Sequence, residues 1–293
     1  MQRIVYINGN YVTEENATVS VFDRGFLFSD AVYEVVAVVQ RSLIDFKAHM
    51  QRLHRSCAAL SLPCPWSVEA LFDIHRHLIQ KNALDEGAIY LQLTRGNPND
   101  RDFHFPDKTI PPTLVMFTQA RSVIQNHFMQ HGLRVITFPD IRWKRRDIKT
   151  VGLLAACLAK HAAHTESAED AWMVEDGFVT EGSSSNAYIV TQGNSIVTRN
   201  LSTSILHGIT RAAVLELAST HGYTIEERAF TVDEAYRAKE CFITSATTLV
   251  LPVTSIDGQA IGTGAPGPVV HQLRSLYIDF LQQEINATQD LHA

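Results

Sequence analysis

The order in which apolar residues recur along the chain limits its fold more than any other sequence feature. Strand-like apolar patterns cover Tyr33–Val39, Ala88–Thr94 and Thr113–Thr118, and helical spacing occurs between the first two of them. The periodicity lapses near Gln119–Gln125, and Leu133–Phe138 then begins a second series of strands and helices. This pattern predicts one α+β unit followed by another, with a domain boundary near residue 120.

Turn residues and apolar periodicity also predict individual elements. Asn8-Gly9, between Arg3–Ile7 and Tyr11–Thr13, predicts a tight β-hairpin because both turn residues tolerate positive φ. A meander of three short strands is expected over Ala171–Thr198, where Gly-containing pairs interrupt the apolar runs. The remaining elements of the second half are predicted as helices over Val151–His164, Ile209–His221 and Pro268–Ile285 and strands over Cys241–Ser245 and Leu251–Ile256.

Composition excludes several classes of protein. The 293 residues are 45% hydrophobic and 19% charged, which is typical of a folded globular chain and not of a disordered one. The formal charge of −6, from 25 basic and 31 acidic residues, has the wrong sign for a nucleic-acid binder. No apolar run approaches the ~18 residues of a membrane span, and the N-terminus meets a turn before any signal-peptide apolar region. We therefore expect no nucleic-acid or membrane partner and a cytoplasmic location.

Metal and disulfide chemistry are not expected. The nearest metal candidate, His161 and His164 beside Glu166, fits a solvated helix face better. The cysteines lack a CxxC pattern, so we expect reduced, mostly buried thiols and neither a zinc site nor a disulfide framework. Their positions are Cys57, Cys64, Cys157 and Cys241.

One glycine pattern is misleading. Gly262–Gly267 satisfies GxGxxG, but a turn at Asp257-Gly258 precedes it and Pro266 interrupts it. A dinucleotide site needs a buried strand before the glycines and a helix opening within them, so a connecting loop is predicted here.

Five short blocks carry chemistry. Lys149 lies between charged residues and an apolar segment, where partial desolvation would favour the neutral amine that attacks carbonyls. Gly208 precedes a helix whose first-turn N–H groups suit a phosphate. Taken alone, these blocks also have ordinary structural explanations. Lys149 could be a surface lysine, TEGSSSN a polar hairpin and GITR an ordinary helix cap. The blocks are His49–Leu53 (HMQRL), Asp147–Lys149 (DIK), Thr180–Asn186 (TEGSSSN), Gly208–Arg211 (GITR) and Ser245–Thr248 (SATT).

Together and in this order, the blocks resemble those of the fold type IV pyridoxal-phosphate aminotransferases. The resemblance also includes Asp23-Arg24-Gly25 and Tyr33-Glu34-Val35-Val36, and so spans nearly the whole chain. Within the family, the chain is most similar to D-amino acid transaminases, through EGSSSN, DIRWxxxDIK and Thr94-Arg95-Gly96 with Arg101 just after it. The resemblance implies an α/β (α+β) fold with a small N-terminal α/β domain, residues 1–120. A larger C-terminal cofactor domain, residues 121–293, would have a β-meander or barrel-like core.

The resemblance also implies the cofactor site. Lys149 would be the catalytic residue, forming the Schiff base with pyridoxal 5′-phosphate and moving the substrate α-proton. Glu181 would contact the pyridine nitrogen, and Leu206 would pack on the ring. Pyridoxamine phosphate would carry the amino group between half-reactions. The other implied cofactor-binding residues are Arg52, Ser184, Ile209, Thr210, Ala246 and Thr247.

Substrate recognition departs from the family pattern. Tyr33, Val35 and Arg101 occupy substrate-binding positions, and Arg101 is expected to reach the substrate carboxylate across a subunit boundary. Phe103 stands where the best-described D-amino acid transaminases have the histidine of an RxH arrangement, so His104 is displaced by one residue.

The resemblance implies a homodimer with its site between domains. The expected reaction is a ping-pong transfer from a D-amino acid to a 2-oxo acid. An (R)-selective amine or branched-chain aminotransferase, and an aminodeoxychorismate lyase, remain alternatives.

Overall fold

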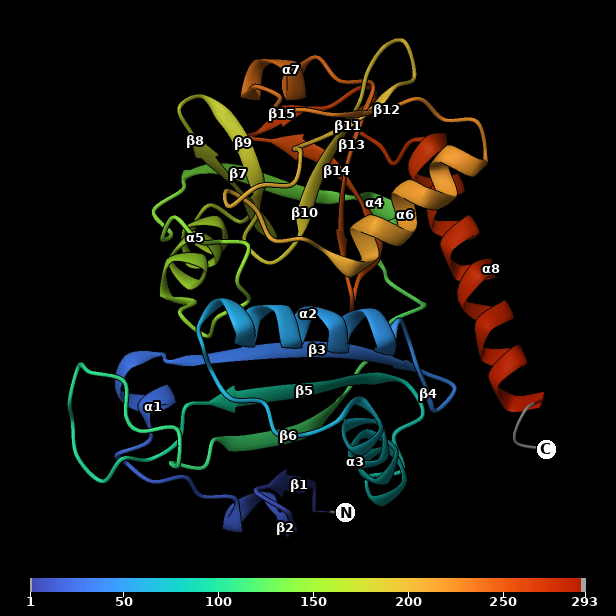
Figure 1. Cartoon of the computed structure of the whole chain (residues 1–293). Coiled ribbons are helices and arrows are strands. Elements are labelled where there is room, and N and C mark those ends of the chain that lie inside the picture. Colours follow the sequence, from blue (N-terminus) through green and yellow to red (C-terminus); the bar gives the residue numbers. More distant parts are fainter. Residues whose placement is uncertain (1, 291–293) are drawn as a thin grey trace. The chain divides into compact units, whose positions relative to one another are not determined.

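The computed structural model describes the backbone of residues 2–290 and the side chains of residues 2–286. The chain forms two compact units (Figure 1). The first runs to Val123 and takes in Ile148–Gly152, whereas the second contains Ile124–Asp147 and the described residues from Leu153 onward. The two-domain boundary near residue 120 stays a prediction. Because Ile148–Gly152 belongs to the first unit, no single boundary along the sequence separates the two units.

The first unit is built on a six-stranded antiparallel sheet. The predicted hairpin is confirmed, because Asn8 (φ 45°) and Gly9 (φ 93°) form the turn between its two strands. The sheet order is β2-β1-β6-β5-β3-β4. The strands are β1 (Ile4–Ile7), β2 (Asn10–Thr13), β3 (Ala31–Val39), β4 (Ser42–Leu43), β5 (Gly87–Thr94) and β6 (Thr113–Ala120).

Helices cover this sheet with their apolar sides. Helix α2 (Phe46–Ala59) packs against β3, as Figure 1 shows, and α3 (Val68–Lys81) packs against β1 and β6. Ser67 caps α3 by accepting a hydrogen bond from the Ala70 N–H. The short helices η1 (Glu14–Asn16) and α1 (Arg24–Phe28) lie in the segment before β3. The N-terminal core therefore joins α2 and α3 to β1, β3, β5 and β6.

The second unit is built on a nine-stranded mixed sheet. Eight strands follow the order β12-β11-β10-β13-β14-β7-β8-β9, and β15 pairs with β14. Strand β9, at one end of this order, also packs against β10, so the sheet curls into the predicted barrel-like core. The strands are β7 (Leu133–Pro139), β8 (Asp170–Glu175), β9 (Phe178–Gly182), β10 (Asn186–Val190), β11 (Ile196–Thr198), β12 (Ile225–Glu227), β13 (Glu240–Ser245), β14 (Leu249–Ile256) and β15 (Gln259–Ala260).

Alternating side chains divide the second unit's core. On β7, Leu133 and Val135 point to the interior of the curled sheet, whereas Ile136 packs toward helix α5 (Leu154–Thr165). Helices α6 (Ile209–Thr220) and α8 (Pro268–Asp290) pack against β13 and against one another. The short helices are α4 (Phe128–His131) and α7 (Val232–Tyr236). No helix in the described part of the chain is both long and apolar enough to cross a lipid bilayer.

Two sequence predictions need correction, and one is confirmed. The predicted helix over Val151–His164 begins only at Leu154, because the Val151 N–H donates to Ala31 O on β3 and not to a helical carbonyl. The predicted three-strand meander has four strands, because Gly182–Ser185 turns the chain between β9 and β10. Gly262–Gly267 lies in the loop between β15 and α8, as predicted.

Candidate functional site

The main chain around Lys149 is fixed by hydrogen bonds to β3 and by a tight turn in which the Thr150 N–H donates to Ile148 O (2.8 Å). The Tyr33 N–H donates to Lys149 O (3.0 Å), and Val32 forms a β-bridge with Thr150. Ile148, one residue earlier, is buried in the N-terminal core. These contacts hold Lys149 at a defined position although no regular helix or strand contains it.

The Lys149 side chain lies over an aromatic ring. Its Nζ is 4.2 Å from the centroid of the Tyr33 ring, and its backbone N–H donates to Ser56 Oγ (3.3 Å). Tyr33 is itself stacked against Tyr90. A ring face attracts an ammonium group, so Tyr33 can orient Lys149 Nζ while that atom holds a proton. The structure thus brings together two residues that the sequence analysis assigned to different roles.

Arg52 forms a buried cluster with Glu34 and His49. Its Nε and one terminal nitrogen donate to the two Glu34 oxygens at 2.8 and 2.7 Å, and His49 Nδ1 lies 2.7 Å from Glu34 Oε2. Burial raises the pKa of Glu34, but the Arg52 charge and the hydrogen bonds from Arg52 and His49 outweigh it and hold that pKa well below its ordinary value. Glu34 therefore stays ionised and fixes the orientation of the Arg52 guanidinium.

Glu181, in the second unit, is a buried carboxylate with several donors. Arg142 donates to Oε1 (2.6 Å), Asn186 Nδ2 donates to Oε2 (2.9 Å), and the Leu206 N–H lies 3.1 Å from both oxygens. Burial raises the pKa of Glu181 above its ordinary value, although Arg142 and the Leu206 N–H act in the opposite direction. A positively charged partner at this carboxylate would favour its ionised form.

Arg142 connects Glu181 to a second buried carboxylate. It donates to Asp140 through Nε (3.0 Å) and a terminal nitrogen (2.8 Å), and Thr180 Oγ1 donates to the same carboxylate (2.6 Å). Burial raises the pKa of Asp140, but the hydrogen bonds and charges of Arg142, Thr180 and Arg146 bring it below its ordinary value. Arg142 is thus the shared cation of a fixed network.

The start of α6 is an uncapped helix N-terminus. Gly208 is its N-cap and provides no side-chain hydrogen bond to the first turn, where Ile209 is half-buried and Thr210 is buried. Asn186 Nδ2 also donates to Leu206 O (3.0 Å), which holds the segment before the helix. A Cβ at Gly208 would lie 2.0 Å from Asn186 Oδ1, so this close approach requires glycine.

The Ser245–Thr248 loop is closed by its own hydroxyl groups. Ser245 Oγ lies 2.7 Å from Thr248 Oγ1 and accepts from the Thr248 N–H. Arg274, on α8, donates to Thr248 O (2.8 Å) and Val250 O (2.7 Å). Ala246 and Thr247 are therefore half-buried in a loop that is fixed at its C-terminal end.

The proposed substrate residues are spread over one strand and one loop. Tyr33 and Val35 lie on β3, whereas Arg101 belongs to the exposed loop after β5. The Arg101 guanidinium lies over the rings of Phe28 (5.1 Å) and Phe103 (5.0 Å).

Two further predicted site residues, His104 and Ser184, are exposed. The His104 side chain is 94% exposed and contacts Asp102. Ser184 is exposed, whereas the next residue, Ser185, has a buried hydroxyl without a hydrogen-bond partner among the described residues. Their roles in the site stay predictions.

Sequence reasoning missed four residues that fix the predicted ones: Glu34, His49, Arg142 and Asn186. All four lie inside the sequence blocks that carried the family resemblance, and this location was the sequence signal that could have identified them. Their roles were not visible because Glu34 and Arg52 are 18 residues apart and Arg142 and Glu181 are 39 apart.

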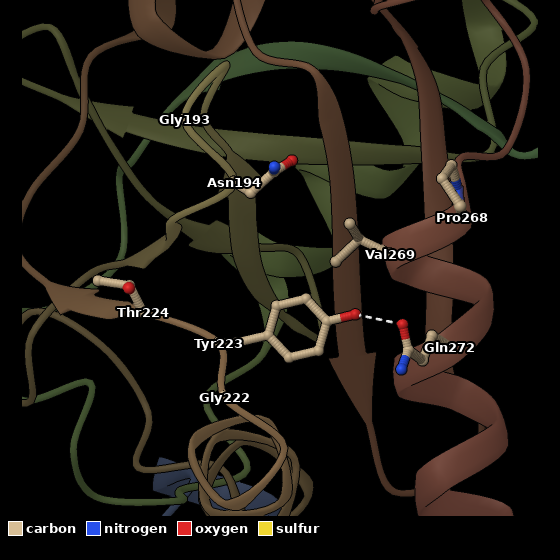
Figure 2. A pocket seen from close by; sticks show the side chains of 8 residues that line it. All are labelled: Gly193, Asn194, Gly222, Tyr223, Thr224, Pro268, Val269 and Gln272. Atoms are coloured by element: carbon tan, nitrogen blue, oxygen red, sulfur yellow. Dashed lines mark hydrogen bonds between the residues drawn. The ribbon is translucent and has the colours of Figure 1, made fainter.

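A surface depression of about 450 Å³ lies elsewhere in the second unit (Figure 2). Tyr223 donates to Gln272 across it (2.6 Å), and none of the predicted site residues lines it. The N–H groups of Val269 and Val270 at the adjacent start of α8 already donate to Glu240, so this helix end does not offer free donors to an anion.

Comparisons with known proteins identify the family of the chain. Residues 31–256 match the family model described as "Amino-transferase class IV". The chain is 39% identical to a D-alanine aminotransferase of Bacillus licheniformis, covering 92% of this chain and 94% of that protein. It is 36% identical to a D-alanine aminotransferase of Staphylococcus aureus, covering 95% and 98%. A solved T.th. branched-chain amino acid aminotransferase, with pyridoxamine 5′-phosphate, has a TM-score of 0.86 at 26% identity and covers 95% of this chain and 94% of that one.

The fold and these matches define a pyridoxal-phosphate-dependent aminotransferase of fold type IV. The chain belongs to the class IV aminotransferase family. It is accordingly an enzyme that transfers amino groups.

Proposed function

We propose that this aminotransferase moves the amino group of a D-amino acid, such as D-alanine, to a 2-oxo acid, such as 2-oxoglutarate, in two successive half-reactions. The observation that carries the proposal is the 39% identity to a D-alanine aminotransferase over 92% of the chain. The proposed cofactor is pyridoxal 5′-phosphate, with pyridoxamine phosphate as the form between half-reactions.

The residues present fit the ring of this cofactor. Glu181 is buried, and burial raises its pKa, so a protonated ring nitrogen would offer it the cationic partner that favours ionisation. When bound, pyridoxal phosphate supplies an aldehyde that takes up the amino group and a ring that accepts electrons from the substrate α-carbon. We assign Glu181 to the ring nitrogen and Leu206 to one face of the ring.

The residues also fit a phosphate. The uncapped first turn of α6 provides N–H donors from Ile209 and Thr210, and a helix N-terminus favours an anion. We assign the Thr210 hydroxyl and Thr247 to the same phosphate, with Ala246 and Ser184 beside them. Arg52, oriented by Glu34, is the cation assigned to this group.

Lys149 is assigned the catalytic role. Its amine would take the proton from the substrate α-carbon and return it in the reverse direction, and the fixed main chain limits where Nζ can reach. Tyr33, 4.2 Å away, would hold the protonated amine through its ring face. Tyr33 would therefore position Lys149 Nζ, and Lys149 Nζ would transfer the proton.

Arg101 is assigned to the substrate α-carboxylate, with Tyr33 and Val35 lining the substrate position and His104 as a further candidate. Two aromatic rings flank the Arg101 guanidinium, which limits its rotation and favours a directed contact with a carboxylate.

We also propose that two copies of the chain associate. Large apolar side chains remain exposed in the single chain, and Phe26 is 73% and Phe105 61% exposed. Such residues support an interface with another copy. A cytoplasmic location stays a prediction.

A half-reaction screen tests the substrate assignment. Purified holoenzyme is mixed separately with D-alanine, L-leucine and (R)-1-phenylethylamine, and the absorbance of the bound cofactor is followed. We expect rapid conversion with D-alanine. Conversion by L-leucine or the amine alone would replace the proposal with a branched-chain or an amine aminotransferase, respectively. Pyruvate release from aminodeoxychorismate without an amino acceptor would instead identify a lyase.

A further inference from the structure

Two cysteines meet at the C-terminal end of α2. Cys57 lies in the last turns of the helix and is 2% exposed, whereas Cys64 is half-buried after the following turn. Arg95 donates to Leu60 O (2.8 Å) and Ser61 O (2.9 Å) and so fixes this turn. The two thiols are therefore held near each other by the fold.

Cys64 packs against the core cluster that contains Cys57, and it contacts His54, which lies one helical turn before Cys57 on the same face of α2. The Cys64 side chain raises the pKa of Cys57, and burial raises it further. The Cys57 side chain, with contributions from His54 and the Trp66 N–H, lowers the pKa of Cys64 to about 7 although burial acts against it. Its lowered pKa and its contact with His54 make Cys64 the more acidic thiol of the pair, and Cys57 the less acidic one.

His54 faces Cys64 in a defined tautomer. Its Nδ1 lies 2.7 Å from Met50 O, and its Nε2 lies 3.9 Å from Cys64 Sγ. A carbonyl oxygen only accepts, so Nδ1 carries the hydrogen and Nε2 of the neutral ring presents a lone pair to the thiol. Nε2 can therefore accept the proton of Cys64.

We propose that Cys64 and Cys57 form a reversible dithiol–disulfide site, with Cys64 as the attacking thiol and Cys57 as the resolving one. The oxidant class is a small disulfide such as glutathione disulfide. The Cys64 thiolate attacks one sulfur of the oxidant, whose S–S bond breaks and releases a thiolate. Cys57 then loses its proton and attacks Cys64 Sγ, which releases the second thiolate. The protein loses two electrons and two protons, and the oxidant gains them as two thiols.

Peptide mapping tests the site without reference to activity. Holoenzyme is treated with glutathione disulfide, alkylated and digested with trypsin, which leaves both cysteines in the peptide Ser56–Arg76. We expect this peptide to be lighter by the mass of two hydrogens and free of bound glutathione. In the Cys57→Ser variant, Cys64 should instead retain glutathione, because no thiol remains to displace it.

Two controls separate the pair from general thiol reactivity. Cys157→Ser removes an exposed cysteine from α5 and should leave the lighter peptide unchanged. In wild-type enzyme, the pH profile of Cys64 alkylation should have its midpoint near 7, below the ~8.5 of a free cysteine, and His54→Gln should move it upward. Stable glutathione on wild-type Cys64 beside a free Cys57, or an alkylation midpoint at or above about 8.5, would overturn the proposal.

Discussion

Replacing Arg142 with methionine tests whether the network around Glu181 is an electrostatic unit. Arg142 donates to Glu181 at 2.6 Å and to Asp140 at 2.8 and 3.0 Å, and its side chain is only 16% exposed. Methionine retains much of the side chain's length but no charge. The variant therefore leaves two buried carboxylates without their shared cation.

The structure sets the size of the effect. Removing one partner of a buried ion pair typically costs about 3–5 kcal/mol of folding free energy. Asp140 retains Thr180 as a donor and Arg146 at 3.4 Å, and Glu181 retains Asn186 and Leu206. We therefore expect a loss near the lower limit, about 3 kcal/mol, in guanidinium unfolding of the cofactor-free enzyme near neutral pH.

The pH dependence distinguishes an electrostatic loss from a packing loss. Burial already raises the pKa of Glu181, and removing Arg142 raises it further, so the folded variant binds a proton that the unfolded chain, with a pKa of about 4.3, releases. A carboxyl with a raised folded-state pKa destabilises the protein above that pKa, and the penalty disappears as the pH falls. The deficit of Arg142→Met should therefore be larger at about pH 8 than at about pH 5.5.

Arg145→Met is the matched control. Arg145 pairs with Asp147 at 3.0 Å on the surface, so the same substitution there should leave the unfolding free energy almost unchanged. The reasoning is refuted if the two variants lose equal stability, or if the Arg142→Met deficit does not change with pH.

The remaining predictions concern the proposed chemistry. Lys149→Ala should fold but not turn over, and borohydride reduction of the wild-type holoenzyme should leave its label on Lys149; a label on another lysine would contradict the assignment. Glu181→Gln should retain the cofactor and slow α-proton removal, so unchanged turnover would leave Glu181 a purely structural role. Arg101→Ala removes a charge-assisted bond of about 1.5–3 kcal/mol and should lower kcat/KM for D-alanine by roughly 10–150-fold, with little change for amines that lack a carboxylate; His104→Ala, assayed in parallel, shows whether that side chain contributes, and equal losses for both substrate classes would locate the carboxylate site elsewhere. Glutathione disulfide should lower turnover of the wild type but not of Cys57→Ser. The reason is that Ser56, beside Cys57, accepts from the Lys149 N–H, so a disulfide at Cys57 would disturb the position of Lys149. A fully active oxidised enzyme would show that the disulfide and catalysis are uncoupled.

Local sequence determined much of the fold and the outline of the site. Asn8-Gly9 specified its hairpin because the turn's φ angles depend only on those two residues. The ordered blocks around Lys149, Glu181 and Gly208 identified the family because each block retains its own short spacing.

Tertiary structure decided the contacts between distant segments. The sequence predicted helix from Val151, but hydrogen bonds to β3 hold Lys149 and Val151 outside any helix and place Lys149 over Tyr33. Likewise, Cys57 and Cys64 have no CxxC spacing, and only the turn after α2 brings them together at one core cluster. Propensity and spacing describe neighbours along the chain, whereas these interactions depend on which segments the sheets and helices bring together.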